Sequence, residues 1–188
     1  MIISITGIPG SGKSTVKKLL AERLKLKSYS MGDMRGKMAM DRGMTIDEFN
    51  TLGLTQAFTD KDADAFQKRL GQTEDDFIID GRLSWYFIPQ SVKVFLDVDI
   101  NEAARRIFEA KKANPKSRPD EPDYASVEEA KVATENRLHN DMARYEKWYG
   151  INYLDRKNYE IVIDTTKTAP TEVVEHILGA LDHNTRFR

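Results

Sequence analysis

The sequence predicts an α/β fold in which a parallel sheet of five strands is covered by helices on both faces. Short apolar segments alternate with longer amphipathic segments along the chain, and a glycine-rich loop joins the first of each kind. The 188 residues are 40% hydrophobic and 31% charged, which suits one well-packed domain. The expected strands are residues 2–5, 26–30, 77–80, 92–98 and 159–164.

We expect one domain, residues 1–188, in which two smaller parts interrupt the core. Residues 31–73 have the pattern of several short helices between two strands, which is too long for a plain crossover and predicts a binding surface. Residues 111–126 hold three of the six prolines and few apolar side chains. They predict a surface loop that serves either as a lid or as a plain connector. The core then comprises residues 1–30, 74–110 and 150–188.

The composition excludes several classes of protein. The chain has no cysteine, which rules out a disulfide scaffold, thiol catalysis and thiolate metal sites. With 29 basic and 30 acidic residues and no basic stripe, we expect no nucleic-acid partner. No apolar run approaches the ~20 residues that span a bilayer, and no signal peptide pattern precedes the first strand. We therefore expect a cytoplasmic monomer without membrane contact.

The first loop has the G-x-x-x-x-G-K-[ST] spacing of a P-loop. Its glycines allow successive backbone N–H groups to point at phosphate oxygens, and the following helix adds its positive dipole end. Lys13 can reach the β- and γ-phosphates, and the Ser14 hydroxyl can hold Mg²⁺. An ordinary strand-to-helix turn is the alternative. The residues expected to bind the nucleotide are Gly7, Ile8, Pro9, Gly10, Ser11, Gly12, Lys13, Ser14 and Thr15.

A carboxylate and a guanidinium follow the third expected strand. Asp80 ends that strand, and in a parallel sheet this places it near the P-loop, where it can bind the waters of Mg²⁺. The alternative for Asp80 is a local cap for Gly81. Arg82 can clamp a phosphate with two hydrogen bonds, or it can form a surface salt bridge.

A long helix is expected from Ser126 to about Tyr149. Arg137, Asp141 and Arg144 share one of its faces, because their spacing is i, i+4 and i+7. They form either an ion-pair stripe within the helix or a charged face turned into a cleft.

Several motifs in this order resemble one enzyme family. They are GIPGSGKST, YSMGDMRGKMAMDRGMTIDEFN, IIDGRLSWYFIP followed by VKVFLDVD, and RLHNDMARYEKWYGI followed by YEIVIDTT. Together they are similar to the nucleoside monophosphate kinases, and most similar to cytidylate kinases of the short archaeal-type branch. The resemblance covers nearly the whole chain. The ordered set Gly32-Asp33, Asp80-Gly81-Arg82 and Arg137/Asp141/Arg144 is more specific than the P-loop, which very many NTPases share.

The resemblance implies a three-layer P-loop NTPase fold, with residues 31–73 as a monophosphate-binding insertion and residues 111–126 as a mobile lid. It implies ATP and Mg²⁺ as cofactors, with Ser14 and Asp80 at the metal and Thr165 beside the adenine. It implies that the catalytic residues are Lys13, Arg82, Arg137, Asp141 and Arg144. It implies that the acceptor contacts Ser30, Gly32, Asp33, Arg35, Gly81, Arg82, Asp141 and Arg144.

The chain also departs from the family pattern. Gly36 stands where many archaeal-type members have an arginine, so Arg35 takes that role or the contact is missing. Asn140 replaces a common serine, and residues 83–86 differ from the bacterial motif. These departures leave the acceptor base open.

We therefore expect a kinase that moves the γ-phosphoryl group of ATP to a nucleoside monophosphate, with CMP or dCMP first. The alternatives are another small acceptor (UMP, AMP or a shikimate-like compound) and a P-loop switch or assembly factor with slow ATP hydrolysis. A switch would need no second phosphate site, and the arginines named above argue against it.

Overall fold

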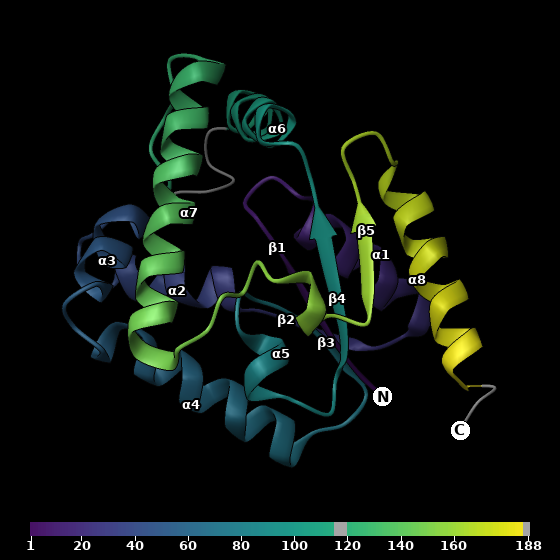
Figure 1. The fold of residues 1–188 in the computed structure, drawn as a ribbon. Helices are drawn as coiled ribbons and strands as arrows, with labels where there is room; N and C mark the ends of the chain where they lie inside the picture. Colours follow the sequence, from purple (N-terminus) through teal and green to yellow (C-terminus); the bar gives the residue numbers. More distant parts are fainter. Residues whose placement is uncertain (115–119, 186–188) are drawn as a thin grey trace.

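The computed structural model describes residues 1–114 and 120–185, and its centre is a parallel sheet of five strands (Figure 1). This confirms the predicted fold class. All six residues of the middle strand are buried, as expected for a parallel strand covered on both faces. The strands lie in the order β2 (Lys27–Ser30), β3 (Phe77–Asp80), β1 (Ile2–Gly7), β4 (Val92–Asp97) and β5 (Ile161–Asp164).

Helices cover both faces of this sheet (Figure 1). The helix α1 (Lys13–Leu24) packs beside the last helix α8 (Pro170–Thr185) on one face. Three helices lie between β2 and β3, namely α2 (Met31–Met40), α3 (Ile46–Gly53) and α4 (Phe58–Thr73). The remaining helices are α5 (Ser84–Phe87), α6 (Ile100–Ala113), α7 (Val127–Tyr149) and a 3₁₀ turn at Arg156–Asn158.

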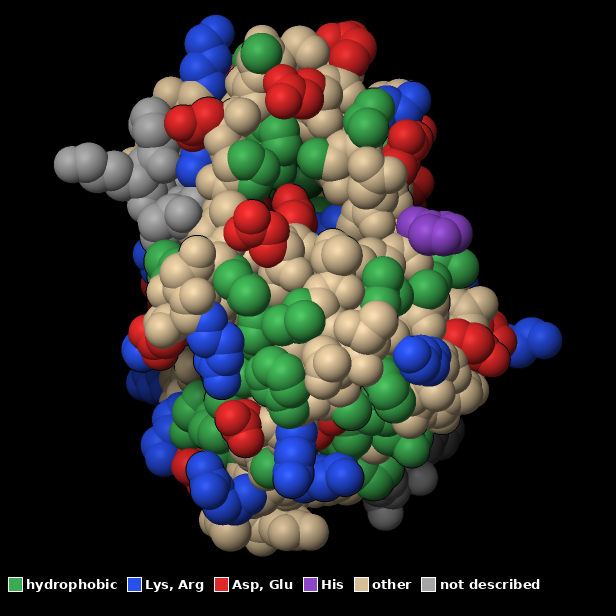
Figure 2. Space-filling model, turned by 90° about the vertical axis from the view of Figure 1, so that its left-hand side faces the viewer, with side chains coloured by type: hydrophobic (Ala, Val, Ile, Leu, Met, Phe, Trp, Pro, Cys, Tyr) green, Lys and Arg blue, Asp and Glu red, His purple; other side chains and the backbone are tan. Residues whose placement is uncertain are grey.

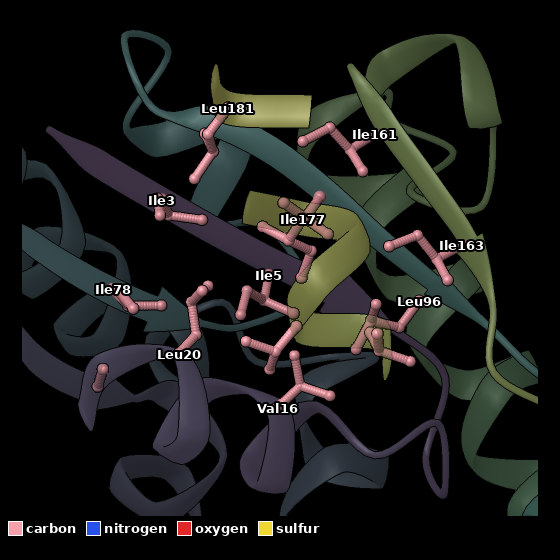
Figure 3. Close-up of a cluster of buried hydrophobic side chains, with 14 residues drawn as sticks. Ile3, Ile5, Val16, Leu20, Ile78, Leu96, Ile161, Ile163, Ile177 and Leu181 are labelled. Atoms are coloured by element: carbon pink, nitrogen blue, oxygen red, sulfur yellow. The ribbon is translucent and has the colours of Figure 1, made fainter. Parts of the chain in front are cut away.

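The largest hydrophobic cluster lies between the sheet and the α1–α8 layer (Figure 3). Ile3 and Ile5 of β1 project toward Leu20 of α1 and Ile177 of α8, and all four are fully buried. Each such side chain contributes about 1.5–3 kcal/mol to folding. The P-loop joins β1 to α1, so this cluster anchors both of its ends.

Smaller apolar clusters fill the other face of the sheet. Phe77 and Ile79 of β3 pack with Met31, Ala63 and residues near them, which attaches α2 and α4 to the sheet. A third cluster joins α5 to α7 through Leu83, Phe87, Tyr145 and Tyr153. The segment between β2 and β3 is therefore held by its own core contacts.

Helix boundaries follow the capping residues. Thr45 accepts a hydrogen bond from the Glu48 N–H and the Glu48 carboxylate accepts from the Thr45 N–H, so the two residues form a capping box at the start of α3. Ser126 caps α7 as expected. The two glycines among residues 31–36 favour a turn, but the structure has a helix there, because α2 begins at Met31. Ser30 caps it by accepting from the Asp33 N–H, and Gly32 lies in the first turn.

Within the described residues no helix is long and apolar enough to cross a membrane. The expected lid begins inside α6, which includes residues 111–113. Residues 115–119 of that segment lie outside the described part of the chain.

Candidate functional site

A cavity of about 780 Å³ opens at the edge of the sheet where β1 and β3 end. The P-loop, the start of α2, the inner face of α7 and the loop after β5 line it. It collects every residue predicted for the site except Gly7 and Ile8. The predicted residues that line the cavity are Pro9, Gly10, Ser11, Gly12, Lys13, Ser14, Thr15, Ser30, Gly32, Asp33, Arg35, Asp80, Gly81, Arg82, Arg137, Asp141, Arg144 and Thr165.

The P-loop has the backbone shape that its glycines predict. Gly10 and Gly12 have backbone φ angles of 77° and 84°, which residues other than glycine rarely adopt. A Cβ on Gly10 would also lie 2.6 Å from the carbonyl oxygen of Ala103 in α6. Gly12 is the residue before α1, so the N-terminus of that helix faces the cavity.

Two predicted residues lie behind the loop. The Gly7 carbonyl accepts a hydrogen bond from Arg82 Nη1 at 3.0 Å. The Ile8 side chain is buried, and its carbonyl accepts from Lys13 Nζ at 2.7 Å. Both residues therefore hold in place, through their carbonyl groups, side chains that line the cavity.

Asp80 has a cationic neighbour that the sequence did not point to. Lys17 Nζ, one turn into α1, lies 2.6 Å from Asp80 Oδ1, and both side chains are largely buried. This pair does not have hydrogen-bond geometry at Oδ1, and Lys17 also donates to the Tyr29 carbonyl at 3.3 Å. The carboxylate therefore has its charge balanced within the protein.

The residues present fit a magnesium ion that is held mainly by phosphates and water. Ser14 and Asp80 both line the cavity and offer hard oxygen donors. No cluster of three or more acidic or histidine side chains occurs in residues 1–114 and 120–185 that could hold a metal by itself.

Asp141 lies between two arginines that line the cavity. Arg82 Nε donates to Asp141 Oδ2 at 3.0 Å, and Arg144 Nη2 donates to Asp141 Oδ1 at 2.9 Å. Burial alone would raise the pKa of the Asp141 carboxyl, but the charges of Arg82, Arg144 and Arg137 outweigh it and hold that pKa below its ordinary value. The carboxylate is thus ionised and orients both guanidinium groups.

A second carboxylate orients arginines from two different elements. Asp60 of α4 pairs with Arg35 of α2, and Arg144 Nε lies 3.3 Å from Asp60 Oδ2. Asn50 of α3 accepts from Arg35 Nη2 at 2.9 Å and from Arg144 Nη1 at 3.1 Å. Arg144, which is only 1% exposed, thus joins α7 to α3 and α4.

Arg137 is bound by a residue of the expected lid. Its Nη1 donates to Glu121 Oε1 at 2.8 Å, and both side chains are largely buried. The neighbouring Asp120 carbonyl accepts from the Ile46 N–H at 3.0 Å, and a Cβ on Gly36 would lie 2.7 Å from Asp120 Oδ2. Residues 120–121 therefore close against α2, α3 and α7, and the carboxylate of Asp120 lies beside Gly36.

Thr165 and Arg106 form the end of the cavity near β5. Thr165 Oγ1 donates to the Asp97 carbonyl at 2.8 Å, and Arg106 Nη2 donates to the Thr165 carbonyl at 2.7 Å. Arg106 also pairs with Glu102 at 2.8 Å. Side-chain hydrogen bonds from Arg105 first, and from Arg106, lower the pKa of Glu102 to about 2 despite its partial burial.

Sequence reasoning missed five residues of this site: Lys17, Asn50, Asp60, Arg106 and Glu121. Three of them hold predicted arginines from other elements, and no local spacing signals such a contact. The position of Arg106 could have been predicted. It lies on α6, which begins after its N-cap Asp99 at the carboxyl end of β4, where ligands bind in a parallel sheet.

The fold and the phosphate-binding loop define a P-loop nucleotide-binding protein. A family model described as "AAA domain" matches residues 3–132. The cytidylate kinase of Halobacterium salinarum is 32% identical over 184 residues, which cover 97% of this chain and 90% of that protein. The cytidylate kinase of Methanocella arvoryzae is 33% identical over 182 residues, which cover 97% of each chain. The chain belongs to the cytidylate kinase family, and the resemblance stated from its motifs is confirmed.

Solved structures with the same fold include kinases for other acceptors. The shikimate kinase of Aquifex aeolicus has a TM-score of 0.56 and 22% identity, and the match covers 98% of each chain. The shikimate kinase of Bacteroides thetaiotaomicron has a TM-score of 0.63 and 15% identity, with 97% of this chain and 98% of that chain covered. At these identities the likeness supports the fold alone.

Proposed function

We propose that the chain transfers the γ-phosphoryl group of ATP to a nucleoside monophosphate, with CMP or dCMP as the acceptor. One observation carries this proposal: a single cavity is lined both by a P-loop and by four arginines from other elements. A protein that only binds or hydrolyses ATP needs the P-loop but not the arginines. Two groups of anion-binding residues in one cavity suit a reaction between two phosphate-bearing substrates.

The donor phosphates lie on the P-loop in this proposal. Backbone N–H groups of residues 10–15 and the ammonium of Lys13 bind them, and the N-terminus of α1 adds favourable charge. Mg²⁺, held by Ser14 with Asp80 close by, supplies further neutralisation of phosphate charge when it is bound. Thr165 and the loop after β5 border the base of the donor nucleotide.

The acceptor phosphate lies against Arg35, Arg82 and Arg137. Asp60 holds Arg35 in position and Asp141 holds Arg82, so these charges require little reorganisation when phosphate binds. The acceptor oxygen attacks the γ-phosphorus as the bond to the β-bridging oxygen breaks, and ADP leaves. No strong base is required for this loose transfer, and no covalent protein intermediate forms.

Two parts of the chain have separate roles in this proposal. Residues 31–73 form the acceptor-binding insertion, and residues 111–126 form the lid that excludes water. We also propose that the monomer is active.

An ADP-release assay with Mg-ATP and a panel of acceptors tests the reaction. We expect ADP release with CMP and dCMP, and much slower release with GMP, shikimate or no acceptor. Nucleotide products are then separated by chromatography, and CDP must appear in step with ADP. ATP hydrolysis that is independent of every acceptor would contradict the proposal and favour a switch or assembly factor.

A further inference from the structure

A second cavity, of about 290 Å³, lies beside the cleft between α3 and α7. Figure 2 shows the side of the molecule on which these helices lie, and its surface is hollowed near the middle of the view between acidic and basic side chains. All lining residues except one are polar, and Asn50 and Arg137 line the main cleft as well. The full set is Asp47, Asn50, Thr51, Ala133, Asn136, Arg137 and Asn140.

Asn50 has a fixed orientation and an unused donor. Its oxygen must face Arg35 and Arg144, because guanidinium groups can only donate hydrogen bonds. Its Nδ2 consequently points away from them, and it donates to no atom of residues 1–114 or 120–185. The side chain is only 4% exposed, yet Nδ2 is not sealed inside the protein. A buried amide donor thus faces the cavities without a partner.

Asp47 supplies an unused acceptor in the same cavity. It lies in the first turn of α3, and its carboxylate makes no hydrogen bond or ion pair with any residue that the structure describes. Burial raises the pKa of this carboxyl above its ordinary value, although Arg137 opposes the shift. A half-buried carboxylate without a donor costs free energy that a ligand N–H group would recover.

Asn140 of α7 adds a second donor. Its oxygen faces Arg144 Nη1 at 3.4 Å, which leaves its Nδ2 without a partner among the described residues. The second cavity therefore presents one acceptor, Asp47, and two amide donors, Asn50 and Asn140. Arg137 lies between this set and the main cleft.

We infer that the second cavity is the base subsite of the acceptor, and that Asp47, Asn50 and Asn140 select cytosine. This inference rests on the proposed function. The hydrogen-bonding edge of cytosine carries an amino donor beside a ring nitrogen and a carbonyl oxygen, both acceptors. Asp47 accepts from the amino group, and the two asparagines donate to the ring nitrogen and the carbonyl. The phosphate of the same nucleotide then reaches Arg35 and Arg137 in the main cleft.

The same set discriminates against other bases. Uracil carries a carbonyl oxygen where cytosine has its amino group, so it would face the carboxylate of Asp47 with no hydrogen between them. Adenine has an amino group beside a ring nitrogen but lacks the carbonyl, which leaves one amide donor unpaired. Unpaired buried polar groups are the main source of such discrimination.

The test is the preference of Asp47→Asn between CMP and UMP. Asparagine keeps an acceptor for the cytosine amino group but adds an N–H donor that can pair with the uracil carbonyl. We therefore expect the ratio of kcat/KM for CMP to kcat/KM for UMP to fall by about tenfold or more. Asp62→Asn is the matched control. This variant makes the same charge change at an exposed position of α4 that lines neither cavity. It should keep the wild-type preference for CMP over UMP.

Asn140→Ala is a second variant, which tests the subsite independently of how well Asp47→Asn folds. Calorimetric titration of each variant with CMP and UMP, without ATP, is a second measurement and gives the two dissociation constants. An unchanged CMP to UMP ratio in both variants, or equal losses for both nucleotides, overturns the subsite while the kinase reaction stands. A preference of the wild-type enzyme for UMP over CMP would also overturn the subsite. If the wild-type chain phosphorylates no monophosphate, the proposed function fails, and the subsite fails with it.

Discussion

The two walls of the cleft are built in different ways. The P-loop wall takes its groups from residues 7–15, and most of the phosphate contacts that we propose for it come from the backbone. The arginine wall takes side chains from α2, α7 and the loop after β3, and each is held by a carboxylate from elsewhere in the chain. Asp60 comes from α4 and Glu121 from the segment before α7. The first wall is therefore set by local sequence, whereas the second exists only once the whole fold has formed.

This difference predicts different responses to substitution. A change in the P-loop wall should affect chemistry and leave stability almost intact. A change in the arginine wall should affect both, because its charges are buried and shared between elements.

Arg144→Met should have the largest effect. It removes one of the two buried arginines that pair with each of Asp60 and Asp141, so the free energy of unfolding should fall by about 3–5 kcal/mol. Chemical denaturation followed by the tryptophan signal measures this. The control is Arg23→Met, which removes an exposed ion pair with Glu175 and should cost at most about 1 kcal/mol. Equal losses in the two variants would show that the Arg144 cluster does not hold the wall together.

Lys13→Ala should separate chemistry from folding. Loss of an ammonium that acts on the transferring phosphate should lower kcat by about a hundredfold to a thousandfold or more. The melting temperature should change little, since Lys13 lies in the cavity wall and not in the core. Lys18→Ala, an exposed lysine of the same helix, should keep full activity. Substantial CMP phosphorylation by Lys13→Ala would contradict the role given to the loop.

The carboxyl group of Asp64 in α4 should make the free energy of unfolding depend on pH. Tyr149 donates to Asp64 at 2.5 Å, and burial raises the pKa of Asp64 to about 6. The folded state thus binds this proton more tightly than the unfolded state, and the contribution of Asp64 to stability is lost as pH rises from about 4 through 6.

Asp64→Asn removes that dependence and keeps an acceptor for Tyr149. Relative to wild type, the variant should gain about 1–2 kcal/mol in unfolding free energy between pH 4.5 and 7.5, a value reduced for partial exposure. Urea unfolding at both pH values measures it. If the two proteins change in parallel with pH, Asp64 is not the responsible group.

Glu121→Gln should have the smallest effect. Its carboxylate competes with the acceptor phosphate for Arg137, and a net hydrogen bond of about 0.5–1 kcal/mol corresponds to a KM lowered by about two- to fivefold. Initial rates at saturating ATP measure this. Asp123→Asn, which changes an exposed carboxylate of the same loop, should leave KM unchanged. A raised KM would mean that Glu121 orients Arg137 for binding.

The contrast between the walls also explains what the sequence could predict. The P-loop, the strand that ends at Asp80 and the face formed by Arg137, Asp141 and Arg144 follow from short-range spacing. The start of α2 could not be predicted in this way. Gly32, at the second position of the helix, favours a turn, and the sequence does not distinguish Ser30 as the N-cap. The pairing of Arg35 with Asp60 joins residues that are 25 positions apart in different helices, and no periodicity encodes it.

The hydrogen bond from the Ile46 N–H to the Asp120 carbonyl connects the segment before α7 to α3, so the two cannot separate without breaking it. Any ligand that holds one of them in place reduces the conformational entropy that the other has left to lose. A ligand that orders the segment before α7 therefore raises the affinity of a ligand that orders α3, and by thermodynamic reciprocity the reverse effect has the same factor.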